Sequence, residues 1–267
     1  MDLSFFIRGS MIHAVLFGTG DKLLICFHGF GEDAEKFRSL EPSLGTHYTV
    51  VSIDLPFHGK TRWQKDDIFY PDDLKKLINE ILQTCEKKKF SLMGYSLGGK
   101  IVFAAIEPFA GQIDEVILVA PDGVKTIAWY DVAVYPAWGR ALFRRFVENP
   151  RFVFSLARLL RSSGVIGERL FNFLKMQTDS EEKRQKVYDV WMAIRYLKSN
   201  LSDIKNLLNT HGIKSYIFIG RYDRVITTRI GHRFSEGLKH NKLIVLEKGH
   251  NLITDALNDP LKKTLGI

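Results

Sequence analysis

Three side chains in this sequence are of the types that carry out nucleophilic acyl transfer: Ser96, Asp223 and His250. A serine hydroxyl is a weak nucleophile near neutral pH. An imidazole, whose ordinary pKa is about 6.5, can take the serine proton and later return it to a leaving group. A carboxylate that is hydrogen-bonded to the imidazole fixes its tautomer and stabilises its protonated form. These residue types therefore predict a serine nucleophile, a histidine base and an aspartate that orients the histidine.

The surroundings of Ser96 match a sharp turn between a strand and a helix. Ser96 lies in the stretch Gly94-Tyr95-Ser96-Leu97-Gly98-Gly99, after the apolar residues 90–93 and before the helix-like run 100–106. A serine projecting from such a turn needs neighbours without side chains two positions before and two after it, and Gly94 and Gly98 meet this need. The turn places Ser96 at a helix N-terminus, so we expect the backbone N–H of Leu97 to stabilise an oxyanion. Because Gly-x-Ser-x-Gly also occurs by chance, an ordinary strand-to-helix turn is the alternative.

A second glycine-rich turn, His28-Gly29-Phe30-Gly31, follows the apolar run 22–27. Glycines directly after a buried strand let the backbone approach a ligand, and the N–H of Phe30 could supply a second oxyanion donor. We assign Phe30 and Tyr95 as substrate-binding residues. Asp54 and His58, in the next turn-rich loop, are more typical of a loop-capping aspartate and a surface histidine, so they are left out of the catalytic set.

Ser96, Asp223 and His250 each come just after an apolar run that is typical of a buried strand. Strands are expected at residues 22–27, 49–53, 90–93, 115–120, 215–219 and 243–246. The carboxyl ends of parallel strands share one edge of a sheet, so residues far apart in the sequence can meet there. Asp122 also follows such a strand and is the alternative acid. Without catalysis, Asp223 would be a turn cap and His250 a loop histidine.

The elements that must position these residues alternate between strands and helices. Residues 3–8 and 11–17 predict a hairpin, residues 33–40 are helix-like, and residues 71–87 predict a helix with a proline and two aspartates in its first turn. Alternation of this kind is typical of a mostly parallel sheet flanked by helices, an α/β fold. We assign residues 1–123 and 210–267 to this core.

Residues 124–209 interrupt the pattern with aromatic and basic helical segments, expected at 137–148, 151–160 and 181–198. This stretch holds 15 Lys and Arg against 8 Asp and Glu, a balance of +7, which is most of the chain's net charge of +8. We expect a helical cap inserted into the sheet domain. Its aromatic and basic residues fit simple packing with a solvated basic face, a pocket for an anionic or partly apolar substrate, or contact with an anionic membrane surface.

Composition sets further expectations. The chain has 267 residues, of which 45% are hydrophobic and 25% charged, as in an ordinary globular protein. It shows no basic tail and no nucleic-acid-binding motif, so no nucleic-acid partner is expected. Cys26 and Cys85 lack metal-ligand spacing. Since the chain itself supplies nucleophile, base and oxyanion donors, we expect no metal and no cofactor.

The N-terminus lacks the features of a secretion signal, which predicts a cytoplasmic protein. Oligomeric state is not predicted.

Taken together, these motifs resemble the α/β-hydrolase superfamily, specifically its cap-bearing single-domain branch. The resemblance covers residues 1–123 and 210–267 and is carried by five segments: His28-Gly29-Phe30-Gly31, Asp54-Leu55-Pro56-Phe57-His58-Gly59, Gly94-Tyr95-Ser96-Leu97-Gly98-Gly99, Gly220-Arg221-Tyr222-Asp223 and Gly249-His250. The family order of nucleophile, acid and histidine is the order found here. The resemblance implies an oxyanion hole built from the Phe30 and Leu97 N–H groups and a substrate pocket between cap and sheet. Phe57 stands where relatives usually carry glycine, and residues 225–228 lack the common proline.

Three functions fit this pattern. The first is a serine hydrolase that cleaves a carboxylic ester or related acyl substrate through an acyl-enzyme. The second keeps the same triad but resembles carbon–carbon bond hydrolases or the menaquinone-pathway lyase, although Lys100 stands where the lyases usually have arginine. The third is a non-catalytic small-molecule receptor on a hydrolase scaffold, because fold does not fix function.

Overall fold

The computed structural model describes residues 1–124, 128–149 and 180–267. Two compact units are present. The first comprises Met1–Gln64, Phe69–Lys125 and Tyr196–Ile267, and the second comprises Lys65–Ile68 and Thr126–Arg195. The first unit contains the sheet and all the residues predicted to be catalytic.

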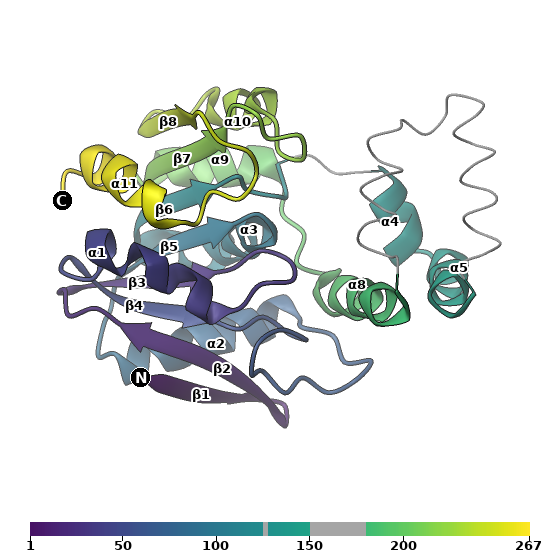
Figure 1. Cartoon of the computed structure of the whole chain (residues 1–267). Coiled ribbons are helices and arrows are strands. Elements are labelled where there is room, and N and C mark those ends of the chain that lie inside the picture. Colours follow the sequence, from purple (N-terminus) through teal and green to yellow (C-terminus); the bar gives the residue numbers. More distant parts are fainter. Residues whose placement is uncertain (125–127, 150–179) are drawn as a thin grey trace. The chain divides into compact units, whose positions relative to one another are not determined.

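The first unit is built on an eight-stranded sheet (Figure 1). The strands are β1 (Asp2–Ile7), β2 (Ser10–Phe17), β3 (Lys22–Phe27), β4 (Tyr48–Ile53), β5 (Phe90–Tyr95), β6 (Ile113–Val119), β7 (Lys214–Gly220) and β8 (Asn241–Leu246). Their order in the sheet is β1-β2-β4-β3-β5-β6-β7-β8. β2 pairs antiparallel with β1 and β4, and all the other pairs are parallel. The prediction of a mostly parallel α/β sheet is confirmed.

The strands form where the sequence is apolar enough to be buried on both faces. Every residue of β5 is buried, as is every residue of β3 after Lys22, which is the pattern of a central parallel strand covered by helices. The edge strand β1 alternates between exposed and buried side chains. It joins β2 through Arg8 and Gly9, whose positive φ angles of 47° and 84° suit a tight hairpin turn. The predicted hairpin is therefore confirmed.

Helices cover both faces of this sheet (Figure 1). On one face the 3₁₀ helix η1 (Ala34–Leu40) contacts α1 (Glu41–Leu44), which in turn contacts α11 (Asn258–Leu265). On the other face α3 (Leu97–Phe109) contacts α2 (Pro71–Thr84) and α9 (Leu201–Thr210), and α10 (Thr228–Ser235) contacts β7 and β8. Short 3₁₀ helices η2 (Ala110–Gln112) and η3 (Asp255–Leu257) complete the unit.

Two predicted helices differ from the structure in detail. The helix predicted at 71–87 ends at Thr84, because Glu86 takes a positive φ of 53° that does not continue a helix. Its start is fixed by the Tyr70 N–H, which donates to Asp73 Oδ2 at 2.8 Å. The segment predicted at 33–40 forms a 3₁₀ helix, and Asp33 caps it by accepting from the Glu35 N–H at 3.1 Å.

The second unit contains α4 (Ala128–Val134), α5 (Ala137–Glu148) and α8 (Glu181–Ile194). These helices pack around their own apolar cluster, whose buried members are Val134, Val147, Tyr188 and Met192. The helix expected at 137–148 coincides with α5, and the one expected at 181–198 ends at Ile194. The segment expected at 151–160 lies outside the described residues. α9, which falls inside the stretch assigned to a cap, belongs to the first unit and contacts α3.

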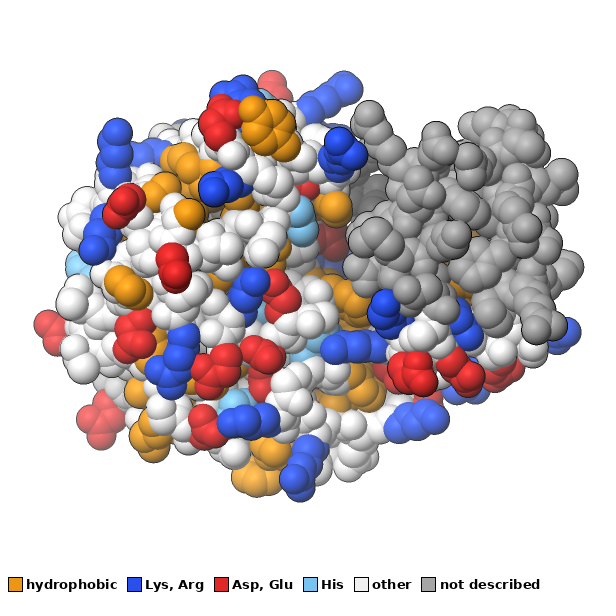
Figure 2. All heavy atoms as spheres, in the orientation of Figure 1, with side chains coloured by type: hydrophobic (Ala, Val, Ile, Leu, Met, Phe, Trp, Pro, Cys, Tyr) orange, Lys and Arg blue, Asp and Glu red, His pale blue; other side chains and the backbone are white. Residues whose placement is uncertain are grey.

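The surface of the first unit carries both signs of charge. On the face shown in Figure 2, Lys and Arg side chains are interspersed with Asp and Glu, and hydrophobic side chains form small separate patches. Within the part of the chain that the structure describes, no helix has both the length and the apolar character needed to cross a bilayer.

Candidate active site

Ser96 stands at the junction of β5 and α3 in a backbone conformation that few residues adopt. Its φ and ψ are 48° and −114°. Three backbone hydrogen bonds hold it there: the Ser96 N–H donates to Val119 O at 3.0 Å, and the Ser96 carbonyl accepts from the Gly99 N–H at 2.9 Å and the Asp122 N–H at 2.8 Å. A strained residue fixed in this way is typical of a functional turn. The sharp turn predicted around Ser96 is present.

The two glycines that flank Ser96 are needed for packing. A Cβ on Gly94 would lie 2.7 Å from the Gly98 carbonyl oxygen, and a Cβ on Gly98 would overlap the carbonyl group of Phe27 at the end of β3. Neither position can hold a side chain without moving backbone. The glycines thus let α3 start directly against β3 and β5.

The structure brings Ser96, His250 and Asp223 together. His250 Nε2 lies 3.0 Å from Ser96 Oγ, and His250 Nδ1 lies 2.7 Å from Asp223 Oδ2. The Asp223 side chain is fully buried, whereas that of His250 is 28% exposed. With Nδ1–H donated to the carboxylate, Nε2 carries the lone pair and can accept the serine proton.

Asp223 is held by the turn after β7. Its Oδ1 accepts the N–H groups of Val225 at 2.7 Å and Ile226 at 2.9 Å, which leaves Oδ2 for His250. Hydrogen bonds from backbone N–H groups stabilise a buried carboxylate and fix its direction. The turn therefore aims one carboxylate oxygen at the histidine ring.

Asp122, the alternative acid, is placed differently. It follows β6, and its Oδ1 accepts the Gly123 N–H at 2.7 Å. Burial raises the pKa of this carboxyl, while the Gly123 N–H and the nearby charges of Lys100 and His250 act in the opposite direction. Asp122 contacts the serine turn with its backbone N–H, which donates to the Ser96 carbonyl oxygen, and not with its carboxylate. The imidazole is thus hydrogen-bonded to Asp223, as the sequence favoured.

The two residues predicted to donate N–H groups to an oxyanion follow neighbouring strands at equivalent positions. Phe27 of β3 pairs with Gly94 of β5, and Phe30 and Leu97 each come three residues later. Leu97 is the first residue of α3, and N–H groups in a helix's first turn have no acceptor within the helix. The two turns also touch, because a Cβ on Gly29 would lie 3.0 Å from the Tyr95 ring. Both predicted donors therefore lie at the same edge of the sheet, just beyond the carboxyl ends of β3 and β5.

Tyr95 contacts the histidine loop. Its hydroxyl donates to the His250 carbonyl oxygen at 3.1 Å, and the two ring centroids are 5.6 Å apart. Burial, together with the carboxylates of Glu32 and Asp223, raises the pKa of Tyr95 far above its usual range, so the hydroxyl keeps its proton. The structure thus gives Tyr95 a contact with His250. Its assignment as a substrate-binding residue, like that of Phe30, stays a prediction.

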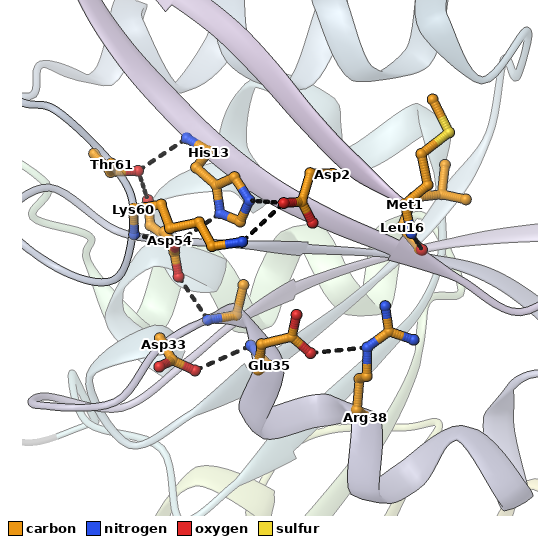
Figure 3. A network of polar contacts seen from close by, with 11 residues as sticks. Met1, Asp2, His13, Leu16, Asp33, Glu35, Arg38, Asp54, Lys60 and Thr61 are labelled. Atoms are coloured by element: carbon orange, nitrogen blue, oxygen red, sulfur yellow. Dashed lines mark hydrogen bonds and ion pairs between the residues drawn. The ribbon is translucent and has the colours of Figure 1, made fainter.

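A second aspartate–histidine pair lies elsewhere in the first unit (Figure 3). His13 Nδ1 is 2.7 Å from Asp54 Oδ2, while His13 Nε2 is 3.5 Å from the carboxylate of Asp2. Asp54 also accepts the N–H groups of Ala34 at 2.6 Å and Lys60 at 2.7 Å. His13 Nε2 thus faces a carboxylate, whereas His250 Nε2 faces the Ser96 hydroxyl. Asp54 acts as a loop-holding residue, the role that the sequence favoured for it, but the expectation of a surface histidine at position 58 is wrong, because His58 is buried.

A model of the alpha/beta hydrolase fold matches residues 22–256. The chain belongs to the α/β-hydrolase fold family. This agrees with the sheet order, with the turn that carries Ser96 and with the positions of Asp223 and His250 after later strands.

Individual relatives of this α/β-hydrolase are distant. An uncharacterized hydrolase, YugF, from Bacillus subtilis (strain 168) is 22% identical over 240 residues, which cover 88% of this chain and 85% of that protein. A pimeloyl-acyl-carrier-protein methyl ester esterase from Neisseria meningitidis is 23% identical over 234 residues, covering 85% of each protein. A solved structure of a thermophilic esterase from Thermogutta terrifontis is similar with a TM-score of 0.68 and 16% identity, covering 100% of this chain and 98% of that one. This last likeness shows the shared fold.

One side chain that was not predicted from the sequence, Lys36, links two parts of this α/β-hydrolase site. Lys36 Nζ lies 3.0 Å from Glu32 Oε1, in the turn after β3, and 3.2 Å from Asn251 Oδ1, next to His250. It bridges the turn that carries Phe30 and the loop that carries His250. The i,i+4 spacing of Glu32 and Lys36 was visible in the sequence, but the third partner is 215 residues away.

Proposed function

We propose that this α/β-hydrolase cleaves carboxylic esters or related acyl compounds through an acyl-enzyme intermediate on Ser96. The observation that carries the proposal is the pair of contacts made by one imidazole, 3.0 Å to Ser96 Oγ and 2.7 Å to Asp223 Oδ2. The base is then within hydrogen-bond reach of both the nucleophile and the orienting acid, which is the arrangement that acyl transfer needs.

In the first half of the reaction, Ser96 Oγ attacks the acyl carbon while His250 Nε2 takes the hydroxyl proton. The carboxylate of Asp223 stabilises the imidazolium that forms. The carbonyl oxygen becomes an oxyanion, and we assign the N–H groups of Phe30 and Leu97 as its donors. Donors fixed in advance act more strongly on this developing charge than on the neutral carbonyl of the substrate.

The tetrahedral intermediate then collapses. The bond to the leaving alkoxide breaks, and the imidazolium of His250 gives that oxygen its proton, so an alcohol leaves and an ester on Ser96 remains. In the second half His250 removes a proton from water, the hydroxide adds to the acyl carbon, and Ser96 leaves with the proton held by His250. The net reaction consumes one water and releases an acid and an alcohol.

The substrate class rests on the site together with one relative. The curated relative from Neisseria meningitidis is a methyl ester esterase at 23% identity, which supports an ester of a small alcohol as the substrate. We propose a small-molecule acyl substrate for the present chain on this basis.

The test is hydrolysis of short p-nitrophenyl esters by a Ser96→Ala variant, with Ser91→Ala as the matched control. Ser91 lies in β5, the strand that leads to Ser96, and its buried hydroxyl has no hydrogen-bond partner among the described residues. We expect Ser96→Ala to lose turnover by at least about 10⁴-fold, the scale of losses for members of such triads, and Ser91→Ala to keep it. Undiminished hydrolysis by folded Ser96→Ala protein would refute the proposal. Release of the phenol without a free acid product would point to a reaction other than hydrolysis.

A further inference from the structure

The peptide bond between Gly29 and Phe30 has a fixed orientation. A trans peptide is planar, so its C=O and N–H point in opposite directions. The Gly29 carbonyl oxygen accepts from His28 Nδ1 at 2.7 Å and from the Glu32 N–H at 3.3 Å. Holding this carbonyl sets the direction of the Phe30 N–H on the other side of the same plane.

The ring of His28 is held in the tautomer that this contact needs. His28 Nε2 accepts the N–H of Leu55, from the loop after β4, at 3.1 Å. A ring nitrogen that accepts a hydrogen bond carries no proton, so the proton of the neutral imidazole is on Nδ1 and is donated to Gly29. His28 is completely buried, so bulk solvent does not compete for these hydrogen bonds.

His58 holds the next peptide of the same turn. Its Nε2 accepts the Gly31 N–H at 3.0 Å, and its Nδ1 donates to the Pro56 carbonyl oxygen at 2.9 Å. The Gly31 N–H belongs to the peptide that follows Phe30. The two peptides on either side of Phe30 are therefore each fixed by one histidine.

The two histidines also contact each other and Phe30. The rings of His28 and His58 meet edge to face with centroids 4.9 Å apart, and the Phe30 and His58 rings do so at 5.7 Å. Farther along the turn, Asp54 Oδ1 accepts the Ala34 N–H at 2.6 Å (Figure 3). The loop after β4 thus holds the turn after β3 at three successive points, through Leu55, His58 and Asp54.

We propose that His28 and His58 are positioning residues that keep the Phe30 N–H directed at the oxyanion formed on Ser96. This inference rests on the proposed function, because only an acyl-transfer reaction develops that oxyanion. Neither histidine needs to touch the substrate. Each acts through one backbone peptide, and each does so with a different ring nitrogen.

This difference allows a sharp test with isosteric variants. The Nδ2 amide group of asparagine occupies about the place of histidine Nδ1, and the Oε1 atom of glutamine about the place of Nε2. His28→Asn therefore keeps a donor for Gly29, whereas His28→Gln loses it. At position 58 the pattern is reversed, since His58→Gln keeps an acceptor for the Gly31 N–H and His58→Asn loses it.

The variants that lose the hydrogen-bonding group, His28→Gln and His58→Asn, should lower kcat for a p-nitrophenyl ester by about 10- to 100-fold with KM little changed. The variants that keep the group, His28→Asn and His58→Gln, should have kcat values within a few-fold of wild type. Loss of one oxyanion donor outright typically costs about 10²- to 10³-fold, so a donor that is only misdirected should cost less. A change confined to kcat is expected because the interaction exists only in the transition state.

Two outcomes would overturn the inference. One is that the two variants at the same position have equal kcat values. The other is that the kcat values of all four variants follow their melting temperatures, and not whether the variant keeps the group that replaces the bonding ring nitrogen. If the variants do not fold, ¹⁵N NMR of histidine-labelled wild-type protein decides: we expect both rings protonated at Nδ1, and an Nε2–H tautomer at either ring contradicts the proposal. The Ser96→Ala variant distinguishes failure of this inference from failure of the proposed function. If Ser96→Ala is inactive but the two variants at each histidine have equal kcat values, the proposed function stands and only the positioning roles of His28 and His58 are refuted.

Discussion

Asp223 and Asp122 are two aspartates that follow adjacent strands, and their different contacts lead us to expect different roles for the two residues. Asp223 orients His250 through a 2.7 Å contact, so Asp223→Asn should lower kcat by about 10⁴-fold, because the amide favours the wrong imidazole tautomer. Steady-state kinetics with a p-nitrophenyl ester measure this. Asp122→Asn is the matched control and should stay close to wild type. If Asp122→Asn were the inactive variant, the assignment of the acid would be wrong.

Asp122 should affect stability instead. Burial raises the pKa of its carboxyl in the folded state above the ordinary value of 3.8, so the charged form is less favourable folded than unfolded. Above the raised pKa the wild type therefore carries a cost that Asp122→Asn lacks, and this difference disappears as the pH falls toward 3.8. Thermal unfolding from pH 4 to pH 8 should show Asp122→Asn more stable only at the upper end. A constant difference across this range would contradict the explanation.

Tyr95 supports His250 through a single hydroxyl. Tyr95→Phe removes the hydrogen bond to the His250 carbonyl but keeps the ring, and a neutral hydrogen bond contributes about 1 kcal/mol. We expect kcat to fall by less than about 10-fold, with the loss explained by a looser histidine loop. Faster hydrogen exchange at residues 249–251 in the variant would support this cause. A loss as large as that of Asp223→Asn would require a direct role for the hydroxyl.

The sequence was sufficient to predict Ser96, Asp223 and His250 because each follows a strand that is recognisable by its apolar run. The structure places these three side chains together. The supporting contacts were beyond prediction for a physical reason. Whether His28 bonds to Gly29 or Tyr95 to His250 depends on side-chain rotamers and on loops from other strands. The Phe-His-Gly tripeptide that occurs at both 27–29 and 57–59 was a visible signal.

At the scale of elements, the start of α3 against β3 is the contact that positions the serine. Gly98→Ala should destabilise the protein by about 1–3 kcal/mol because its Cβ would overlap the Phe27 carbonyl. Helix propensity alone predicts the opposite sign. Gly111→Ala is the control, since a Cβ there would have no atom within 4 Å. Urea unfolding should separate the two variants, and equal stability would mean that the close packing at Gly98 is unimportant.

Element types were predictable, and element ends were less so. The strands and the helix at 137–148 follow from apolar periodicity and from clear breaks in it. The helix expected through residue 198 stops at Ile194, and Asn200 begins a new one by accepting the Ser202 N–H at 2.9 Å. A local capping contact of this kind competes with continuing the helix, and periodicity does not reveal which is more stable.

At the scale of the whole molecule, each of the two compact units has its own apolar core. Met192→Ala in the second unit and Ile117→Ala in the centre of the sheet should each cost about 2–5 kcal/mol locally. Hydrogen exchange measured by mass spectrometry should show Met192→Ala accelerating α4, α5 and α8 while leaving β5 and β6 protected. Ile117→Ala should accelerate the strands. Equal acceleration everywhere in the Met192→Ala variant would show that the units unfold as one.

We propose that Ser96 becomes acylated because His250 removes its proton. Rapid quenching of the protein with p-nitrophenyl acetate, followed by mass spectrometry of its peptides, tests this most directly. We expect an acetyl group on the peptide containing Ser96 in wild type within one turnover, and almost none in His250→Ala, which lacks the ring nitrogen that lies 3.0 Å from Ser96 Oγ. Acetylation of another residue, or of Ser96 at the wild-type rate in His250→Ala, would contradict it.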